Sequence, residues 1–243
     1  MKSSTTATPV PEVSAPTFGA VDQVDQYDEA GHLTARTYVR LGVLHGTMTA
    51  FAEDDKVVTV APYEAGVLHG VLKIFDEAGR PVQEASYWHG VQQGLTRVFV
   101  QGHLLSEQHY LAGRLHGESK AYAESGDVTV KQFYKNGLLE GEALFLNEAA
   151  LVRRAQNRKG QLEGESLDYD RDGALVQRAI YKNNLLEGPL RRYLPNGQVL
   201  EESLYLAGKP VVRPRRFDNK GTEVREEGAS STFMQRIEKL VKG

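Results

Sequence analysis

The 243-residue sequence contains no cysteine. This excludes disulfides, thiolate metal sites and cysteine nucleophiles, and it fits a reducing compartment. No apolar run approaches the roughly 18 to 20 residues that a membrane-spanning helix needs. The first twenty residues contain one lysine but no apolar stretch of the kind that a signal peptide has. From these absences we expect a cytoplasmic protein.

The sequence also has little net charge. Its formal charge is −3 at pH 7 and its isoelectric point is about 6.2. Proteins that bind nucleic acid or anionic lipid without sequence recognition rely on a strong positive charge. We therefore expect no nucleic-acid partner, and association with a membrane is not the favoured interpretation.

Glycine is abundant, with 24 residues, and it is periodic. Pairs of glycines four residues apart recur along the chain, usually preceded by a tyrosine such as Tyr38, Tyr63 or Tyr87. The leading positions follow one another at intervals of 23 or 24 residues, at 42, 66, 90, 113, 137, 160, 184 and 208, with asparagine at 184. A repeat of this length is typical of an array in which each unit packs on its neighbours. The sequence therefore predicts one elongated domain.

A second periodic feature lies between the glycine pairs, where an aromatic residue is followed by a polar turn that ends in glycine. Tyr27 precedes one such turn and Phe75 another, and we place Phe51, Phe99 and Phe145 in the same series. Two turns per unit leave two stretches of about six or seven residues, the length of a strand, and they are rich in β-branched and aromatic residues. The pattern predicts an all-β fold, an elongated array of antiparallel β-hairpins that form a long twisted sheet.

The two ends of the chain differ from the array. Residues 1–20 contain three prolines among small polar residues, so we expect a flexible tail there. We assign residues 21–228 to the array, as about eight units of 23–24 residues. Residues 229–243 place apolar side chains on one face at helical spacing, which predicts a short amphipathic helix that caps the open end of the sheet. A helix that docks a partner is the alternative.

Several units resemble a known repeat. The segments Tyr-Lys-Asn-Gly-Leu-Leu-Glu-Gly at 134–141, Tyr-Leu-Ala-Gly-Arg-Leu-His-Gly at 110–117 and Tyr-Glu-Ala-Gly-Val-Leu-His-Gly at 63–70 resemble the MORN repeat in its bacterial variant form. The resemblance extends over about residues 22–222. It implies a β-hairpin array that is used for binding. Bacterial relatives are often described as antitoxin-like or as immunity proteins beside secreted toxins, including type VI effectors, and eukaryotic ones as tethers of proteins or membranes.

One set of residues, which we call the polar row, shares the position just before the second glycine. Its members are His45, His69, Gln93, His116, Glu140, Glu163 and Glu187. Equivalent Cα atoms in successive repeats should lie about 10 Å apart, because two strands separate them. Ligands of one zinc ion lie about 2.0 to 2.1 Å from it, so neighbours in this row would lack a third partner. We therefore expect no metal and no cofactor, and polar turn residues that face water, cap turn amides or contact a partner.

Basic residues gather in the later repeats, and two of them, Arg154 and Arg192, are candidates for partner binding. The 24-residue period relates Arg154 to Arg178 and Arg192 to Arg216, which would produce short positive stripes. The same period relates Arg192 to Asp168. We therefore favour a mixed surface on which opposite charges screen one another.

No set of residues indicates catalysis, because the sequence has neither a Gly-x-Ser-x-Gly elbow nor a pair of histidines at helical metal-site spacing. We expect no enzymatic activity and no catalytic residue. The favoured interpretation is a protein-binding module, an immunity or antitoxin protein that occludes the active site or another required surface of a cognate toxin. A sheet with Tyr, Phe and Arg exposed on one face would supply the anchors. The alternative is a structural scaffold or membrane tether that uses the helix at 229–243.

Overall fold

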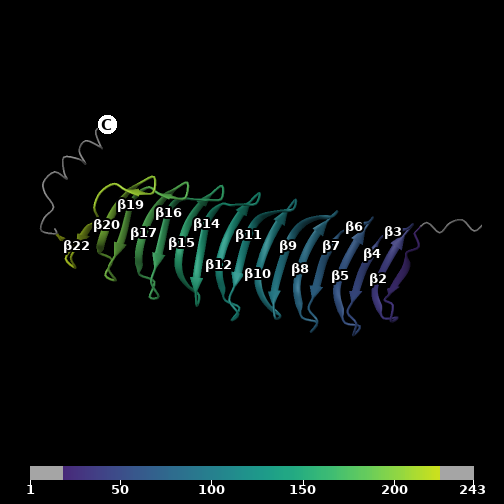
Figure 1. Cartoon of the computed structure of the whole chain (residues 1–243). Helices are drawn as coiled ribbons and strands as arrows, with labels where there is room; N and C mark the ends of the chain where they lie inside the picture. The colour runs from purple at the N-terminus through teal and green to yellow at the C-terminus, as the bar shows by residue number, and fades with distance from the viewer. Residues whose placement is uncertain (1–18, 225–243) are drawn as a thin grey trace, which may run out of the picture.

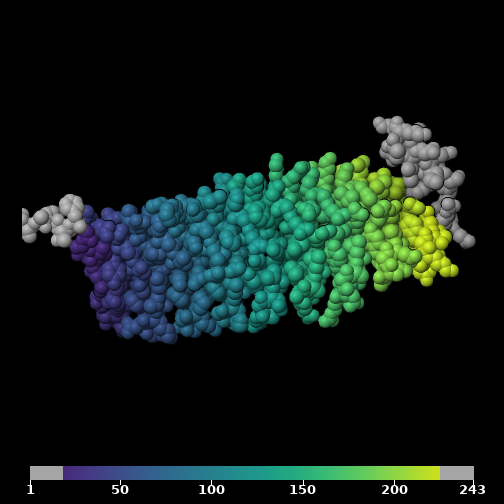
Figure 2. Space-filling model, turned by 180° about the vertical axis from the view of Figure 1, so that it is seen from behind, coloured from purple at the N-terminus to yellow at the C-terminus, as the bar shows by residue number. Residues whose placement is uncertain are grey.

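The computed structural model describes residues 19–224, which form a single open sheet of 23 strands (Figure 1). Each strand runs antiparallel to its neighbours, and the described residues contain no helix. The molecule is long, with the first repeat at one end and the last at the other (Figure 2). The predicted all-β hairpin array is confirmed. The helix predicted at 229–243 and all but the last two residues of the predicted tail lie outside the described residues.

The strands follow the chain in order. They are β1 (Asp22–Tyr27), β2 (Leu33–Arg40), β3 (Val43–Leu44), β4 (Gly46–Phe51), β5 (Val57–Glu64), β6 (Val67–Leu68), β7 (Gly70–Phe75), β8 (Pro81–Trp88), β9 (Val91–Val100), β10 (His103–Leu111), β11 (Arg114–Tyr122) and β12 (Val128–Lys135). The second half comprises β13 (Leu138–Leu139), β14 (Gly141–Asn147), β15 (Ala150–Arg158), β16 (Gln161–Tyr169), β17 (Leu175–Lys182), β18 (Leu185–Leu186), β19 (Gly188–Tyr193), β20 (Val199–Leu206), β21 (Lys209–Pro210), β22 (Arg215–Phe217) and β23 (Glu223–Val224).

Neighbours in the sheet are neighbours in the chain, so the topology is a meander. In many repeats the strand after the glycine turn is split in two, and the residue of the polar row lies at the break. His69, for example, separates β6 from β7, and its backbone amide donates to the carbonyl of Pro62 at 2.9 Å. In β9, β11 and β16 the same stretch is continuous and nine or ten residues long. The strands therefore exceed the predicted six or seven residues where no break occurs. No helix within residues 19–224 is long and apolar enough to cross a membrane.

Four of the polar turns at one edge of the sheet are held by aspartate side chains. The carboxylate of Asp76 accepts hydrogen bonds from the backbone amides of Ala78 at 3.0 Å and Arg80 at 2.8 Å. Asp28, Asp170 and Asp218 make the same pair of bonds in their own turns. A short side chain that can bond the backbone two and four residues ahead explains why aspartate opens these turns.

The two faces of the sheet differ in what they bury. One face, which we call the alanine face, has a central row of small residues buried between longer neighbours, namely Ala61, Ala85, Thr96, Ala143, Ala155, Ser166, Ala179 and Ser203. Register pairs such as Leu72 with Ala85 and Ala85 with Thr96 keep this row aligned from strand to strand. The other face, the reverse face, has a central row of charged residues, including Lys73, Glu84 and Arg97.

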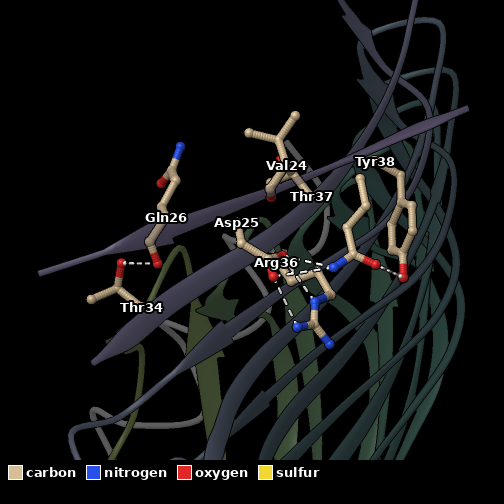
Figure 3. A network of polar contacts seen from close by, with 8 residues as sticks. Val24, Asp25, Gln26, Thr34, Arg36, Thr37 and Tyr38 are labelled. Carbon is tan, nitrogen blue, oxygen red and sulfur yellow. Dashed lines mark hydrogen bonds and ion pairs between the residues drawn. The ribbon is translucent and has the colours of Figure 1, made fainter. Parts of the chain in front are cut away.

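The first hairpin shows how a strand divides its side chains between the faces (Figure 3). On the reverse face, the guanidinium of Arg36 donates to both carboxylate oxygens of Asp25 at 2.9 and 3.0 Å, and the hydroxyl of Tyr38 donates to Gln23 at 3.4 Å. Thr37, between Arg36 and Tyr38, belongs to the alanine face, because consecutive residues of a strand point to opposite sides.

The two aromatic series lie on opposite faces, so the expectation of Tyr, Phe and Arg on one face holds only in part: the aromatics before the polar turns share the reverse face with arginines such as Arg97, and the tyrosines before the glycine pairs do not. Tyr110 donates to Gln108 at 3.1 Å on the alanine face, whereas Tyr122 donates to Glu107 at 2.7 Å on the reverse face. Glu107 and Gln108 are adjacent in β10, which places the two tyrosines on opposite sides. The tyrosines before the glycine pairs follow Tyr110, and the aromatics before the polar turns follow Tyr122.

Two aromatic residues do not fit the series to which the sequence assigned them. Val39, not Tyr38, occupies the position that Tyr63 has in the next repeat, since Val39 pairs with Leu44 as Tyr63 pairs with Leu68. In the same way Phe145 lies one residue before the aromatic position of its repeat. Each of these side chains is therefore on the face opposite to the one that its series occupies.

Candidate functional site: the glycine-turn edge

Two-residue turns form the second edge of the sheet, which we call the glycine-turn edge. Both turn residues have positive φ, as at Ala65 (48°) and Gly66 (84°), the geometry of a type I′ turn. The same geometry recurs in all eight turns of this edge, and Asn183 and Asn184 adopt it at 50° and 66°. Asparagine tolerates the left-handed region better than most residues, which explains how it replaces glycine at position 184.

Each of these turns after the first is bonded to the repeat before it. The amide of Gly66 donates to the carbonyl of Leu44 at 2.8 Å, and that of Gly90 to Leu68 at 2.8 Å. Equivalent bonds continue through Gly113, Gly137, Gly160, Asn184 and Gly208, at 2.7 to 3.1 Å. These bonds form a continuous ladder along the edge. Each bond holds a turn against the strand that follows the previous glycine turn.

The polar row lies against this ladder. Carboxylate oxygens of Glu140, Glu163 and Glu187 accept hydrogen bonds from the first turn amide of the next repeat, at 2.9, 3.0 and 2.7 Å. The Nδ1 atom of His116 lies 3.4 Å from the equivalent amide, that of Asn136. Among the interpretations of the row, capping of turn amides is thus the one that these contacts support. The glutamates stabilise the join between repeats.

His69 has a different environment from the other members of the row. Its ring lies against those of Trp88 and His89, with centroids 4.3 and 4.8 Å away. Its Nδ1 atom lies 3.1 Å from a carboxylate oxygen of Glu64. His45, the first member, donates its backbone amide to the carbonyl of Tyr38 at 2.8 Å, as His69 does to Pro62.

Exposed apolar side chains follow the glycine-turn edge on the reverse face, and we call them the apolar stripe. They are each 40–59 % exposed, and they are Val43, Val67, Trp88, Val91, Leu111, Leu138, Leu185 and Leu206. Valine or leucine just after a turn also contacts the next turn, since a β-carbon on Gly66 would lie 3.2 Å from Val43. The stripe therefore runs along the repeats and is held by the same turns as the polar row. No individual residue of it stood out in the sequence, because an exposed and a buried valine look the same there.

The two candidate arginines do not form one site. Arg154 is on the reverse face, between Glu142 at 3.6 Å and Glu165 at 4.0 Å. Arg192 is on the alanine face, 3.7 Å from Glu201. The contacts have the mixed character that the 24-residue period indicated, and exposed pairs of this kind contribute little to stability one at a time.

Within the charged row of the reverse face, Glu107 has the most distinctive surroundings. Hydrogen bonds from the hydroxyl of Tyr122 at 2.7 Å and from Nε of Arg97 at 2.9 Å hold the pKa of Glu107 below its usual range. Burial, together with the bond to Glu107, raises the pKa of Tyr122 to about 12. Both shifts favour an ionised glutamate beside a neutral tyrosine at neutral pH.

Glu107→Gln is expected to lower the free energy of unfolding by about 1 kcal/mol at pH 7, because it removes a charge-assisted hydrogen bond at a partly exposed site. The folded pKa of Glu107 is lowered, so its contribution is present above the pKa of an unfolded glutamate, about 4.3, and is lost as the pH falls through the folded value. The wild type and the variant should therefore converge in acid. Urea titrations at several pH values measure this, with the exposed Glu124→Gln as the control. A difference that stays constant down to pH 3 would contradict the assignment.

Comparison with protein families assigns four segments of the array to a known type of repeat. The MORN repeat variant matches residues 68–89, 115–136, 162–183 and 186–207, each of which begins or ends near a glycine-turn. Repeats of this kind are non-enzymatic modules that generally bind proteins or membranes. The matched segments are therefore MORN-type repeats, and the other turns of the edge repeat their geometry. No curated protein matched the chain in a sequence search.

Proposed function

We propose that this protein is a non-catalytic binding module that holds a partner protein along the apolar stripe. The observation that supports the proposal is the exposure of apolar side chains at seven of the eight turns of the glycine-turn edge, all but the turn at Lys159 and Gly160. Contiguous exposed apolar surface is rare on monomeric proteins and marks interaction sites. Trp88 has the chemistry of an anchor, because tryptophan is enriched among the residues that dominate binding energy.

The polar row would set the choice of partner. It runs beside the apolar stripe, with histidine in the early repeats and glutamate in the later ones. A partner would therefore meet mostly imidazoles in the early repeats and carboxylates in the later ones, which favours one partner over another. Because Glu140, Glu163 and Glu187 also cap turns, their side chains are held in place before binding, and less conformational entropy is lost on association.

Of the two candidate arginines, Arg154 belongs to the proposed interface, since it shares the reverse face with the apolar stripe. Arg192 is on the alanine face and would take part only if the partner wrapped around the sheet. The proposal therefore assigns the contact to the reverse face and keeps Arg154 as a peripheral contact.

The finer form of the proposal is that the partner is a toxin, type VI-secreted or otherwise, which the array neutralises in the cytoplasm by occluding its active site or another required surface. This form is supported by the resemblance to the bacterial variant of the repeat. The described residues offer no observation in favour of the scaffold or membrane tether, whose distinguishing segment is 229–243.

A capture experiment with matched variants tests the interface. The tagged full-length chain is recovered from its own cells beside the double variant Val91→Asp with Leu111→Asp, which places two charges in the apolar stripe. The control, Val100→Asp with Leu105→Asp, changes the same two strands at the opposite edge, at side chains of similar exposure. We expect the wild type and the control to retain one stoichiometric protein and the stripe variant to lose it. Equal retention by all three would overturn the proposed surface.

Expression of the captured protein then tests the finer form. A toxin should arrest growth when it is expressed without the array, and co-expression of the wild-type array should restore growth while the stripe variant should not. A captured protein that is harmless on its own would leave the binding module in place and refute neutralisation.

A further inference from the structure

Three side chains that can bind a metal meet at the glycine-turn edge. Glu64 ends β5, His69 lies between β6 and β7, and His89 is the first residue of the turn between β8 and β9. Their nearest ligand atoms all lie within 4.8 Å of one another. No other group of three within residues 19–224 has this arrangement. The three residues come from two successive repeats.

The backbone brings these residues together. The turn at Ala65 and Gly66 folds the end of β5 back on β6, which places Glu64 beside His69. The hydrogen bond from the amide of Gly90 to the carbonyl of Leu68, at 2.8 Å, joins the next turn to the residue before His69. His89 therefore lies over His69 because the ladder between repeats holds it there.

The imidazole of His69 has a ring nitrogen that is free to coordinate a metal ion. Its Nδ1 atom is buried and has no hydrogen-bond partner of acceptable geometry, although it lies 3.1 Å from the carboxylate of Glu64. Buried polar atoms normally have a hydrogen-bond partner, so a buried nitrogen without one indicates a position where a bound ion could be the partner. The ring of Trp88 packs against both imidazoles, with centroids 4.3 Å from His69 and 4.9 Å from His89.

We propose that Glu64, His69 and His89 bind a divalent transition-metal ion such as Zn²⁺. Two imidazoles and one carboxylate are a donor set that zinc accepts, with a fourth position for water or for a group of the partner. Tetrahedral ligands about 2.1 Å from an ion lie roughly 3.4 Å apart, so separations of up to 4.8 Å must close by at most about 1.4 Å, which side-chain rotation at this partly exposed site permits. The ion would join two adjacent repeats at the point where the apolar stripe has its tryptophan.

The spacing argument against metal does not apply to this cluster. That argument compared equivalent members of the polar row, which are two strands apart. His89 is not a member of the row. It is the first turn residue of the next repeat, and this position is occupied by Ala65 opposite His45 and by Asn136 opposite His116. Only the repeat of His69 places a second imidazole there.

Trp88 is the only tryptophan of the chain, so its fluorescence reports on this site alone. Untagged full-length protein is titrated with Ni²⁺, which quenches a nearby indole, and Zn²⁺ is then added as a competitor that should restore the emission. We expect saturable quenching with one ion per chain. His69→Gln and His89→Asn should each raise the Ni²⁺ concentration for half-quenching at least tenfold.

The replacements are ones that the chain itself uses, since Gln93 and Asn136 occupy the equivalent positions in other repeats, and both should preserve the fold. The emission and circular dichroism of the metal-free variants check this. His116→Gln changes the same row position in a repeat whose next turn begins with Asn136 and not with histidine, and its titration should match that of the wild type. Three outcomes would overturn the proposal. The first is quenching that does not saturate, the second is an unchanged half-quenching concentration in either His69→Gln or His89→Asn, and the third is a rise of that concentration in His116→Gln as large as in those two variants.

Discussion

Ala85→Asp is expected to lower the free energy of unfolding by about 3 kcal/mol or more. Ala85 is 0 % exposed at the centre of the alanine face. Its register partners are Leu72, which is apolar, and Thr96, whose hydroxyl already accepts a hydrogen bond from Gln92 at 2.8 Å. A carboxylate would lose its hydration at this position without gaining a cation, and the longer side chain would also force apart the neighbours that now cover the alanine.

Val82→Asp is the matched control, because it places the same group on the same strand at a side chain that is 37 % exposed. It should cost less than about 1 kcal/mol, as most surface substitutions do. Urea unfolding followed by the emission of Trp88, at the end of the same strand, measures both variants. Equal losses for the two would show that the small central row is not what holds the sheet together.

Gly70→Ala is expected to destabilise the protein by about 2 to 3 kcal/mol, because two costs combine. Gly70 has φ of +118°, which L-residues rarely adopt, and a β-carbon there would lie 2.9 Å from Cγ of Pro62. The proline ring cannot rotate away, so the backbone of β5 or β7 would have to shift. This position is where the broken strand resumes after His69, and a shift would also disturb the ladder between the repeats.

Gly141→Ala isolates the conformational part of that cost. Gly141 is the equivalent residue of a later repeat, but its φ is +77° and a β-carbon would meet nothing within 4 Å. We expect a loss of about 1 kcal/mol there, from backbone strain alone. Thermal unfolding of the two variants gives the comparison. A loss for Gly141→Ala as large as for Gly70→Ala would mean that conformation, and not the contact with Pro62, decides the outcome.

Much of the fold follows from residues that the chain repeats. Positive φ in a two-residue turn favours glycine or asparagine, so Gly66, Gly90 and Asn184 mark their turns directly in the sequence. The aspartates of the polar turns can be recognised in the sequence in the same way, because their carboxylates accept hydrogen bonds from backbone amides within four residues. The polar row could also be found from its period, and the capping by Glu163 was among the roles expected of it.

The assignment of side chains to faces could not be obtained in the same way. A period of 23 or 24 residues identifies equivalent positions to within about one residue, whereas one residue decides the face. Tyr38 and Phe145 illustrate this, because each differs by one position from its series and so lies on the other side. The breaks after the glycine turns and the register shifts before the polar turns add further uncertainty of the same kind.

The sequence by itself therefore determined a meander of hairpins and the position of each turn, because the conformation of a turn depends on the few residues within it. Only the tertiary structure decided which residues of different repeats meet. The apolar stripe depends on strand register, and the cluster of Glu64, His69 and His89 depends on a hydrogen bond between Gly90 and Leu68. Both depend on backbone pairing between strands, and an error of one residue in reading the period is enough to misplace that pairing.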